Sequence, residues 1–293
     1  MKTNKINNII VIAIVLLATV ASAYGIFSGE LISENQVVQT IYNETVQLYG
    51  KGLYHNESVS MASQVRAQDM VTLLIAVPFL IYALILNNKQ SIKGQFLLTG
   101  TLGYFLYTYA SLCFVAMYNY LFLLYVALMG LSFFGFVINI TSMDTKKIKL
   151  HFSKKLPSTY LGYSIIIFGI AISLMWLGRL VPAIFTGMPE GIEHYTTFPI
   201  QALDLGIVLP TAILSGIMLI QRKALGYLLA PVIIIKAVTM LLAINAMAIS
   251  MLINHVNISI MELIVFPLCT VVFCFNLYLI MKNLNSNKEI ANK

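Results

Sequence analysis

The chain has 293 residues, of which 59% are hydrophobic and only 10% are charged, and its formal net charge is +7. Soluble domains average about 45–50% apolar and about 25% charged residues, so this composition excludes an ordinary soluble fold and indicates a polytopic membrane protein. The basic residues are spread over several connections and do not gather with aromatic residues, which argues against nucleic acid as a partner and leaves the lipid bilayer.

Apolar stretches of about 20 residues, the length of a helix that crosses a bilayer, recur along the whole sequence. We expect eight spans, near residues 9–27, 70–87, 95–117, 121–141, 159–178, 200–220, 225–250 and 259–281. Period-two alternation is absent, and backbone in lipid must satisfy its own hydrogen bonds, so we expect helices and not a barrel. The predicted fold is an all-α, polytopic helical membrane bundle that forms one domain over residues 1–293.

The first apolar stretch permits two interpretations. Its basic start, its apolar residues 9–20 and the small residues Ala21, Ser22 and Ala23 fit a signal peptide with a cleavage site. The uncharged stretch nevertheless continues to Phe27 and is long enough to span a bilayer. We therefore expect a retained helix, whereas cleavage would leave seven helices.

Residues 28–67, between the first and second spans, form the longest connection, which we expect outside the cytoplasm. Residues 36–50 (QVVQTIYNETVQLYG) suggest an amphipathic helix, followed by a glycine-containing turn and by a helix that starts near Ser58 and continues into the second span. Arg66 and Asp69 lie three residues apart on one face of that helix, close enough to pair.

The third span carries a stripe of hydroxyl side chains. Thr101, Tyr104, Thr108 and Ser111 recur at helical spacing, and Tyr107 lies beside them. This stripe is expected to point into the bundle.

Two charged residues fall within later spans. Asp204 lies about one turn below the outer end of the sixth span, on a face that it shares with Gln201. Lys236 lies near the bilayer midplane, roughly 16 Å past the cytoplasmic end of its helix at 1.5 Å per residue. Inserting such a lysine costs about 2.5–3.5 kcal/mol, so we expect it to be buried against a carboxylate, first Asp204 and second Asp69. The alternative is a lysine that snorkels or fixes a single helix contact.

The distribution of positive charge predicts the orientation. Most basic residues fall in alternate connections: Lys2, Lys5, Lys89, Lys93, Lys146, Lys147, Lys149, Lys154, Lys155, Arg222, Lys223, Lys282, Lys288 and Lys293. The other connections hold only Lys51, Arg66 and Arg179. The positive-inside rule therefore places both termini in the cytoplasm.

An internal repeat is a further hypothesis. The stretches from Asp69 to Gly94 and from Asp204 to Gly226 each combine an acidic residue, a proline within the span, a basic loop and a glycine followed by leucine pairs. Both run in the same direction, as in the parallel repeats of some transporters, although apolar helices also match by chance. Four prolines fall inside predicted spans, where they are either simply tolerated or open space beside a site: Pro78, Pro210, Pro231 and Pro267.

Recognisable motifs for catalysis or metal binding do not occur in the sequence. His55, His194 and His255 show no HxH or HExxH spacing, and GxSxG, Walker and GxGxxG motifs are absent. The three cysteines lie within predicted spans without CxxC spacing, so no structural disulfide is expected. We expect neither a metal nor a cofactor.

Several segments together resemble a group of bacterial multi-pass inner-membrane proteins that has no established activity. They are QVRAQDMVTLL, GTLGYFLYTYAS with YNYLFLLYVAL, and QALDLGIVLP with GYLLAPVIIIKAVTM, and the likeness covers residues 60–250. The resemblance implies a bacterial inner-membrane location. It implies no reaction, and it assigns no role to Arg66, Asp69, Asp204 or Lys236.

The leading functional hypothesis is a permease-like or sensor-like bundle that binds a small polar or ionic ligand from the outer side. The expected pocket combines Arg66, Asp69, Tyr104, Tyr107, Gln201, Asp204 and Lys236. The first alternative is a membrane-embedded enzyme that acts on lipid, with Asp69 and Asp204 as acid–base groups. The second is a non-catalytic assembly partner whose charges pair with another membrane protein.

Overall fold

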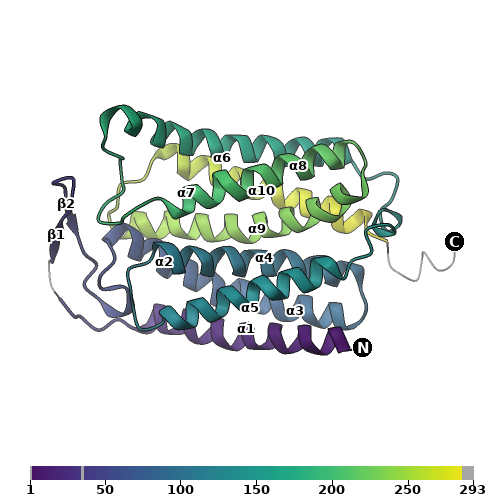
Figure 1. Cartoon of the computed structure of the whole chain (residues 1–293), viewed down its shortest axis with the longest axis horizontal. Helices are drawn as coiled ribbons and strands as arrows, with labels where there is room; N and C mark the ends of the chain where they lie inside the picture. The colour runs from purple at the N-terminus through teal and green to yellow at the C-terminus, as the bar shows by residue number, and fades with distance from the viewer. Residues whose placement is uncertain (1, 34–35, 286–293) are drawn as a thin grey trace.

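The structure, a computed structural model, describes residues 2–33 and 36–285 and is a bundle of long helices (Figure 1). The first five spans contain α1 (Lys2–Phe27), α2 (Val59–Val71), η2 (Thr72–Ala76), α3 (Val77–Asn88), α4 (Ile92–Val115), α5 (Phe122–Thr141) and α6 (Ser158–Thr186). The last three contain α7 (Pro199–Leu203), η4 (Asp204–Val208), α8 (Leu209–Ile220), α9 (Ala224–Ile253) and α10 (Ile260–Asn283). The elements α2, η2 and α3 form one continuous span, as do α7, η4 and α8.

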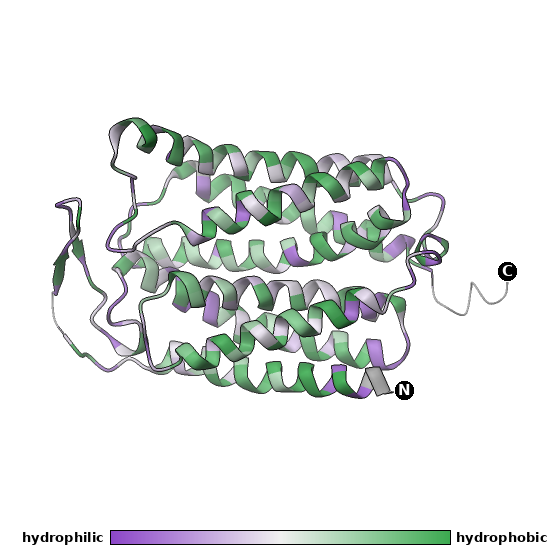
Figure 2. Cartoon of the chain, viewed as in Figure 1, coloured by the Kyte–Doolittle hydropathy of each residue, from purple (hydrophilic) through white to green (hydrophobic). Residues whose placement is uncertain are grey.

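Eight helices of the described part of the chain are long and apolar enough to cross a membrane, which confirms the predicted all-α multi-pass membrane fold. Large apolar side chains such as Leu16, Leu74, Ile167 and Phe185 lie exposed on the outer faces of these helices. Figure 2 shows that the helices are mainly hydrophobic and that hydrophilic residues concentrate in the loops at the two ends. Such an apolar outer surface is typical of a bundle that is surrounded by lipid.

The segment before the second span contains a β-hairpin, so the amphipathic helix expected over residues 36–50 was a wrong prediction. Strands β1 (Val37–Gln39) and β2 (Thr45–Gln47) pair antiparallel. The turn between them holds Asn43 at a φ of 61°, in the left-handed region that asparagine tolerates well. β-branched residues on both sides of this turn favour strands over helix. We call this end of the bundle the hairpin end, and the end where α1 begins and α10 finishes the terminal end (Figure 1).

The helix expected from about Ser58 is present. Ser58 caps α2, because its Oγ accepts a hydrogen bond from the backbone N–H of Met61 at 3.0 Å. The second span thus includes residues 59–67, which the sequence had suggested as part of the connection. Arg66 and Asp69 lie in the second half of α2.

The bundle consists of two halves, which Figure 1 shows as two layers: α1–α5 in one and α6–α10 in the other. Helices α4 and α9 pack together where the halves meet. The backbone of α4 at Gly100 approaches the side chain of Ile235 and the carbonyl of Val232 in α9 so closely that a Cβ would collide there.

A constant offset of 132 residues relates the central elements of the two halves. It maps the π-helical turn η2 (Thr72–Ala76) onto the π-helical turn η4 (Asp204–Val208), and Pro78 onto Pro210 just after each turn. Gln90 and Arg222, which the same offset relates, have φ angles of 59° and 55° in the loops that follow. The order and spacing of these features are those expected of a parallel repeat.

The glycines after those loops occupy equivalent positions. A Cβ on Gly94 would collide with the backbone nitrogen of Asn87, and one on Gly226 with that of Leu219. In this register Asp204 corresponds to Thr72, not to Asp69, so the equivalence of the two aspartates that the sequence suggested is wrong by three residues. The same register pairs Lys236 with Tyr104.

Candidate functional site

A cavity of about 680 Å³ opens within the second half near the hairpin end. Its walls come from α6, α7, η4, α8, α9 and α10, and α2 and α4 of the first half close one side. Most of the wall is apolar and rich in aromatic and sulfur-containing side chains, among them Phe168, Met175, Trp176, Met240, Phe266 and Phe273. This combination of an apolar wall and a few polar groups is typical of small-molecule sites.

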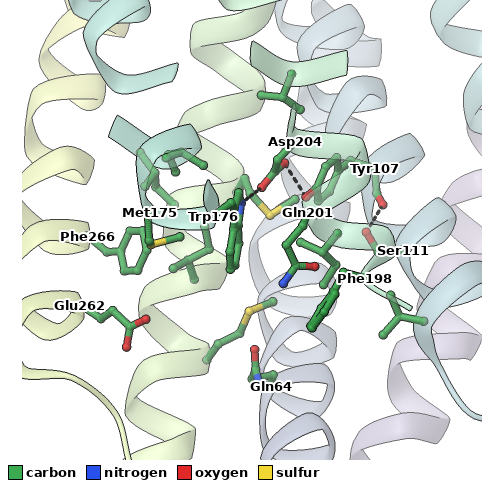
Figure 3. A pocket seen from close by; sticks show the side chains of 18 of the residues that line it. Gln64, Tyr107, Ser111, Met175, Trp176, Phe198, Gln201, Asp204, Glu262 and Phe266 are labelled. Carbon is green, nitrogen blue, oxygen red and sulfur yellow. Dashed lines mark hydrogen bonds between the residues drawn. The ribbon is translucent and has the colours of Figure 1, made fainter. Parts of the chain in front are cut away.

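Asp204 is the central acidic group of this cavity (Figure 3). Its Oδ1 accepts a hydrogen bond from the hydroxyl of Tyr107 at 2.8 Å, and its Oδ2 accepts one from Nε1 of Trp176 at 2.9 Å. Asp204 begins the π-helical turn η4, and such turns occur frequently at functional sites. Two donors from α4 and α6 therefore hold the carboxylate in place.

Lys236 lines the deep part of the same cavity, but it does not form the direct ion pair with Asp204 that we expected. Its Nζ lies 4.0 Å from the centroid of the Tyr107 ring, in a cation–π contact. Within the described residues the ammonium makes no hydrogen bond, and the ion pair of Lys147 with Asp144 is the only one. Tyr107 thus stands between the two charges: its ring faces the lysine, and its hydroxyl reaches the aspartate.

Of the remaining predicted site residues, Gln201 also lines the cavity, together with Gln64 and Gln68 from α2. Figure 3 shows Gln201 between Asp204 and Phe198. The structure therefore brings together Tyr107, Gln201, Asp204 and Lys236, from both halves.

Arg66, Asp69 and Tyr104 do not line the cavity, so the structure does not bring them together with the other four residues of the expected pocket. Asp69 lies in the first half, where its Oδ2 accepts a hydrogen bond from the hydroxyl of Tyr54 at 2.7 Å. The Tyr54 hydroxyl lies 3.4 Å from that of Tyr125. We call Asp69, Tyr54 and Tyr125 the Asp69 cluster; all three side chains are buried.

The expected pairing of Arg66 with Asp69 is absent from the ion pairs of the described residues. Arg66 donates instead to the Tyr49 hydroxyl and, at 3.1 Å, to the carbonyl oxygen of Ile26 at the end of α1. It therefore anchors the connection before α2. The Tyr104 hydroxyl lies 2.8 Å from Thr72 Oγ1, inside the first half.

A loop of the second half, residues 187–198, lines the cavity at the hairpin end (Figure 1), and we call it the lid. The lid residues Glu193 and Tyr195 line the cavity. The lid is bonded to the first half: the Tyr195 hydroxyl donates to Glu57 Oε2 at 2.6 Å, and Ser58 Oγ donates to Glu193 Oε2 at 2.5 Å. The Met117 backbone N–H donates to Glu57 Oε1 at 2.7 Å.

Glu57 is buried outside the membrane spans, with 1% of its surface exposed. Burial raises the pKa of its carboxyl group from 4.5 to about 7, and the neighbouring Glu193 acts in the same direction. Burial also raises the pKa of Tyr195, so its hydroxyl keeps the proton that it donates to Glu57. The contact between lid and first half thus depends on a carboxyl group that titrates near neutral pH.

The sequence did not point to Trp176, to Glu57 or to the lid. Trp176 is the one tryptophan of the chain, and this rarity was the only feature of the sequence that could have drawn attention to it. The lid contacts join residues 56–58 to residues 193–195, and no local pattern encodes such a long-range pairing.

The residues that the structure describes contain no group of three or more His, Cys, Asp or Glu side chains that could hold a metal ion. Comparisons with protein-family models, with curated proteins and with solved structures give no match for this chain.

Proposed function

We propose that this chain is a permease-like membrane protein that takes up a small ligand from the hairpin side and binds it in the cavity of the second half. The observation that carries this proposal is the Lys236 ammonium group, which lines an apolar cavity without a hydrogen-bond partner among the described residues. A buried ammonium group without a hydrogen-bond partner can donate its N–H groups to a ligand.

The arrangement of the halves supports transport over static binding. Many transporters consist of two similar halves with the substrate site between helices near the midplane, and rocking of one half against the other exposes the site alternately. Here Tyr107 of the first half reaches Asp204 of the second, so the site includes side chains from both.

The charge distribution supports an orientation with the hairpin end outside and both termini in the cytoplasm. Together with the resemblance described above, this favours a bacterial inner membrane. The alternative of a lipid-modifying enzyme with Asp69 and Asp204 as acid–base partners loses support, because Asp69 does not line the cavity.

The test is a thermal-shift screen of the purified protein against a library of small metabolites. Ligands of the cavity should stabilise the parent protein and should stabilise Lys236→Met much less. Lys154→Met, at an exposed position in the connection between α5 and α6, is the matched control and should respond like the parent. Uptake of a hit into proteoliposomes then measures transport. Hits that stabilise Lys236→Met equally would overturn the proposal.

A further inference from the structure

A tyrosine side chain from the connection before α2 is inserted into the interior of the first half. Tyr54 belongs to the short helical turn η1 (Gly52–Tyr54) in the connection before α2, and only 1% of its surface is exposed. Its hydroxyl meets Asp69 of α2 and Tyr125 of α5, and it lies so close to Gly25 of α1 that a Cβ there would contact it. Tyr54 is therefore inserted between α1, α2 and α5.

The repeat maps this place onto the cavity. The 132-residue offset relates the second span to the sixth, and the order of the spans relates α1 to α6 and α5 to α10. Residues of α6, α7 and α10 line the cavity. The connection that supplies Tyr54, residues 28–58, has its shorter counterpart in the lid, which lines the second site and does not fill it.

We infer that the first half is a copy of the ligand site that Tyr54 plugs permanently, and that the open cavity takes a ligand of similar chemistry: a neutral molecule with an aromatic or similarly flat apolar body and a hydroxyl group. This inference rests on the proposed function and names its ligand class.

The polar groups of the cavity fit a hydroxyl. Asp204 accepts two hydrogen bonds, and a carboxylate has about four acceptor sites, so it can accept one more. Lys236 has three N–H donors and no acceptor. A hydroxyl both donates and accepts, so one such group can donate to the aspartate and accept from the lysine. In the first half the Tyr54 hydroxyl likewise donates to a carboxylate, that of Asp69, whose counterpart in the repeat is Gln201 of the cavity wall.

Charge balance favours a neutral ligand. Within the spans, Lys236 and Asp204 carry opposite charges in the same cavity, so their sum is zero. The other charged residues of the wall, Arg179, Glu193 and Glu262, lie nearer its hairpin end. A ligand with a net charge would leave one charge without compensation in a medium of low dielectric constant, which is costly. The cavity wall fits the ring, because Trp176 and Phe266 offer aromatic faces and Met175 and Met240 offer sulfur atoms that pack well against rings.

The single tryptophan of the chain lies in the cavity, so its fluorescence reports occupancy directly. The probe is 4-methylphenol, which reproduces the tyrosine side chain, and toluene is the matched control without a hydroxyl. We expect 4-methylphenol to change the Trp176 emission saturably and to bind about tenfold more tightly than toluene, which corresponds to about 1.4 kcal/mol. Lys236→Met and Asp204→Asn should each weaken 4-methylphenol binding and leave toluene binding nearly unchanged.

A second measurement tests the plug. In Tyr54→Ala, 4-methylphenol should raise the melting temperature by several degrees more than in the parent protein, because it refills the vacated site next to Asp69. Tyr54→Phe retains the ring and should gain no such extra stabilisation. The melting experiment with Tyr54→Ala is independent of the fluorescence titration of the parent protein. If Tyr54→Ala fails to fold, the fluorescence titration alone decides the test.

Equal affinity for 4-methylphenol and toluene, or no saturable binding of either, would overturn the inference. If ligands of other chemistry bind in a Lys236-dependent way while 4-methylphenol does not, the proposed function stands and the ligand class assigned here is wrong. If neither class binds with Lys236 dependence, both fail.

Discussion

Tyr107 connects the two charges of the cavity and also the two halves of the bundle. It belongs to α4 of the first half, its ring lies under the Lys236 ammonium of α9, and its hydroxyl donates to Asp204 of η4. Because ring and hydroxyl act on different partners, substitutions can separate the two contacts.

Tyr107→Phe should retain the cation–π contact and remove one donor from Asp204. A hydrogen bond to a buried charged group is worth about 1.5–3 kcal/mol, so we expect a destabilisation of that order in detergent unfolding experiments. Tyr118→Phe is the control, since Tyr118 is 77% exposed, and it should change the free energy of unfolding by less than about 0.5 kcal/mol. Equal effects of the two substitutions would contradict the role assigned to the Tyr107 hydroxyl.

Lys236 and Asp204 should be coupled although they are not in direct contact. Lys236→Met or Asp204→Asn alone leaves one charge uncompensated in the cavity, whereas the double variant leaves none. We therefore expect the double variant to be less destabilised than the sum of the single variants, with a coupling of about 0.5–3 kcal/mol. Melting temperatures of the three variants measure this coupling, and strict additivity would show that the charges do not interact.

Glu57 predicts a pH dependence of stability. Its pKa is about 7 in the folded protein against an ordinary value of 4.5, so the folded state holds the proton more tightly than the unfolded state. The stability that Glu57 contributes is therefore fully present below about pH 4.5, falls as the pH rises through 7 and is lost above it. The upper limit of this contribution is about 3 kcal/mol, from about 1.4 kcal/mol per pKa unit.

Glu57→Gln should flatten this pH dependence and should be more stable than the parent protein at pH values above about 7. The measurement is the melting temperature as a function of pH. Glu30→Gln, at an exposed position of the same connection, is the control and should follow the parent curve. A parent protein whose melting temperature does not fall across this range would contradict the assignment to Glu57.

Among the elements, α1 is packed into the first half on one face. Val11, Ile14, Ala18 and Ala21 are almost completely buried. Arg66 also bonds to the carbonyl of Ile26 at the end of this helix. These contacts make α1 an integral part of the packing of the first half.

We predict that the mature protein keeps α1, because cleavage after Ala23 would expose the apolar surface of α3 and α5 that α1 covers. Intact-mass spectrometry of the protein purified from its membrane decides the matter. A mature N-terminus at Tyr24 would show that the stretch acts as a signal peptide.

Elements were predictable to the extent that their signals are local. The spans follow from length and hydropathy, and the start of α2 follows from Ser58, a common capping residue. The strands of the hairpin were missed because three-residue strands give almost no periodicity, although Asn43 within a β-branched segment was a usable signal.

The candidate site was predictable only in part, for a related reason. Tyr107, Gln201, Asp204 and Lys236 were identifiable as polar residues within spans, but depth alone does not tell which helices are neighbours. Asp69 has a depth similar to that of Asp204 and lies in the other half. Each π-helical turn also shifts the face that follows it, so Thr211, at regular helical spacing from Asp204, does not line the cavity.

At the scale of the whole molecule, the two halves have the same order of helices but differ in the side chains that occupy their interiors. In the first half, tyrosines occupy the interior, and Tyr104 meets Thr72 where the second half has Lys236 and Asp204. The second half has a cavity in the corresponding place. In the proposed function, the hollow second half binds the ligand and the filled first half packs against it.

The orientation of the bundle is the remaining global property, and it determines from which side a ligand reaches the cavity. The exposed connection between α5 and α6 contains Lys154, whereas the lid contains Thr196, which is also exposed at the opposite end. The positive-inside rule predicts that the basic connection lies in the cytoplasm and the lid outside. The three native cysteines are unpaired and can be replaced to give a background without thiols.

We predict that, in this background and in intact cells, a membrane-impermeant thiol reagent labels Thr196→Cys and does not label Lys154→Cys. After the membrane is permeabilised, both should react, which controls for the accessibility of each position in the folded protein. The opposite pattern would reverse the orientation. The lid and the cavity would then face the cytoplasm, and the same geometry would serve a ligand that arrives from the cell interior, so that binding at Lys236 would survive as a proposal while uptake from outside would not.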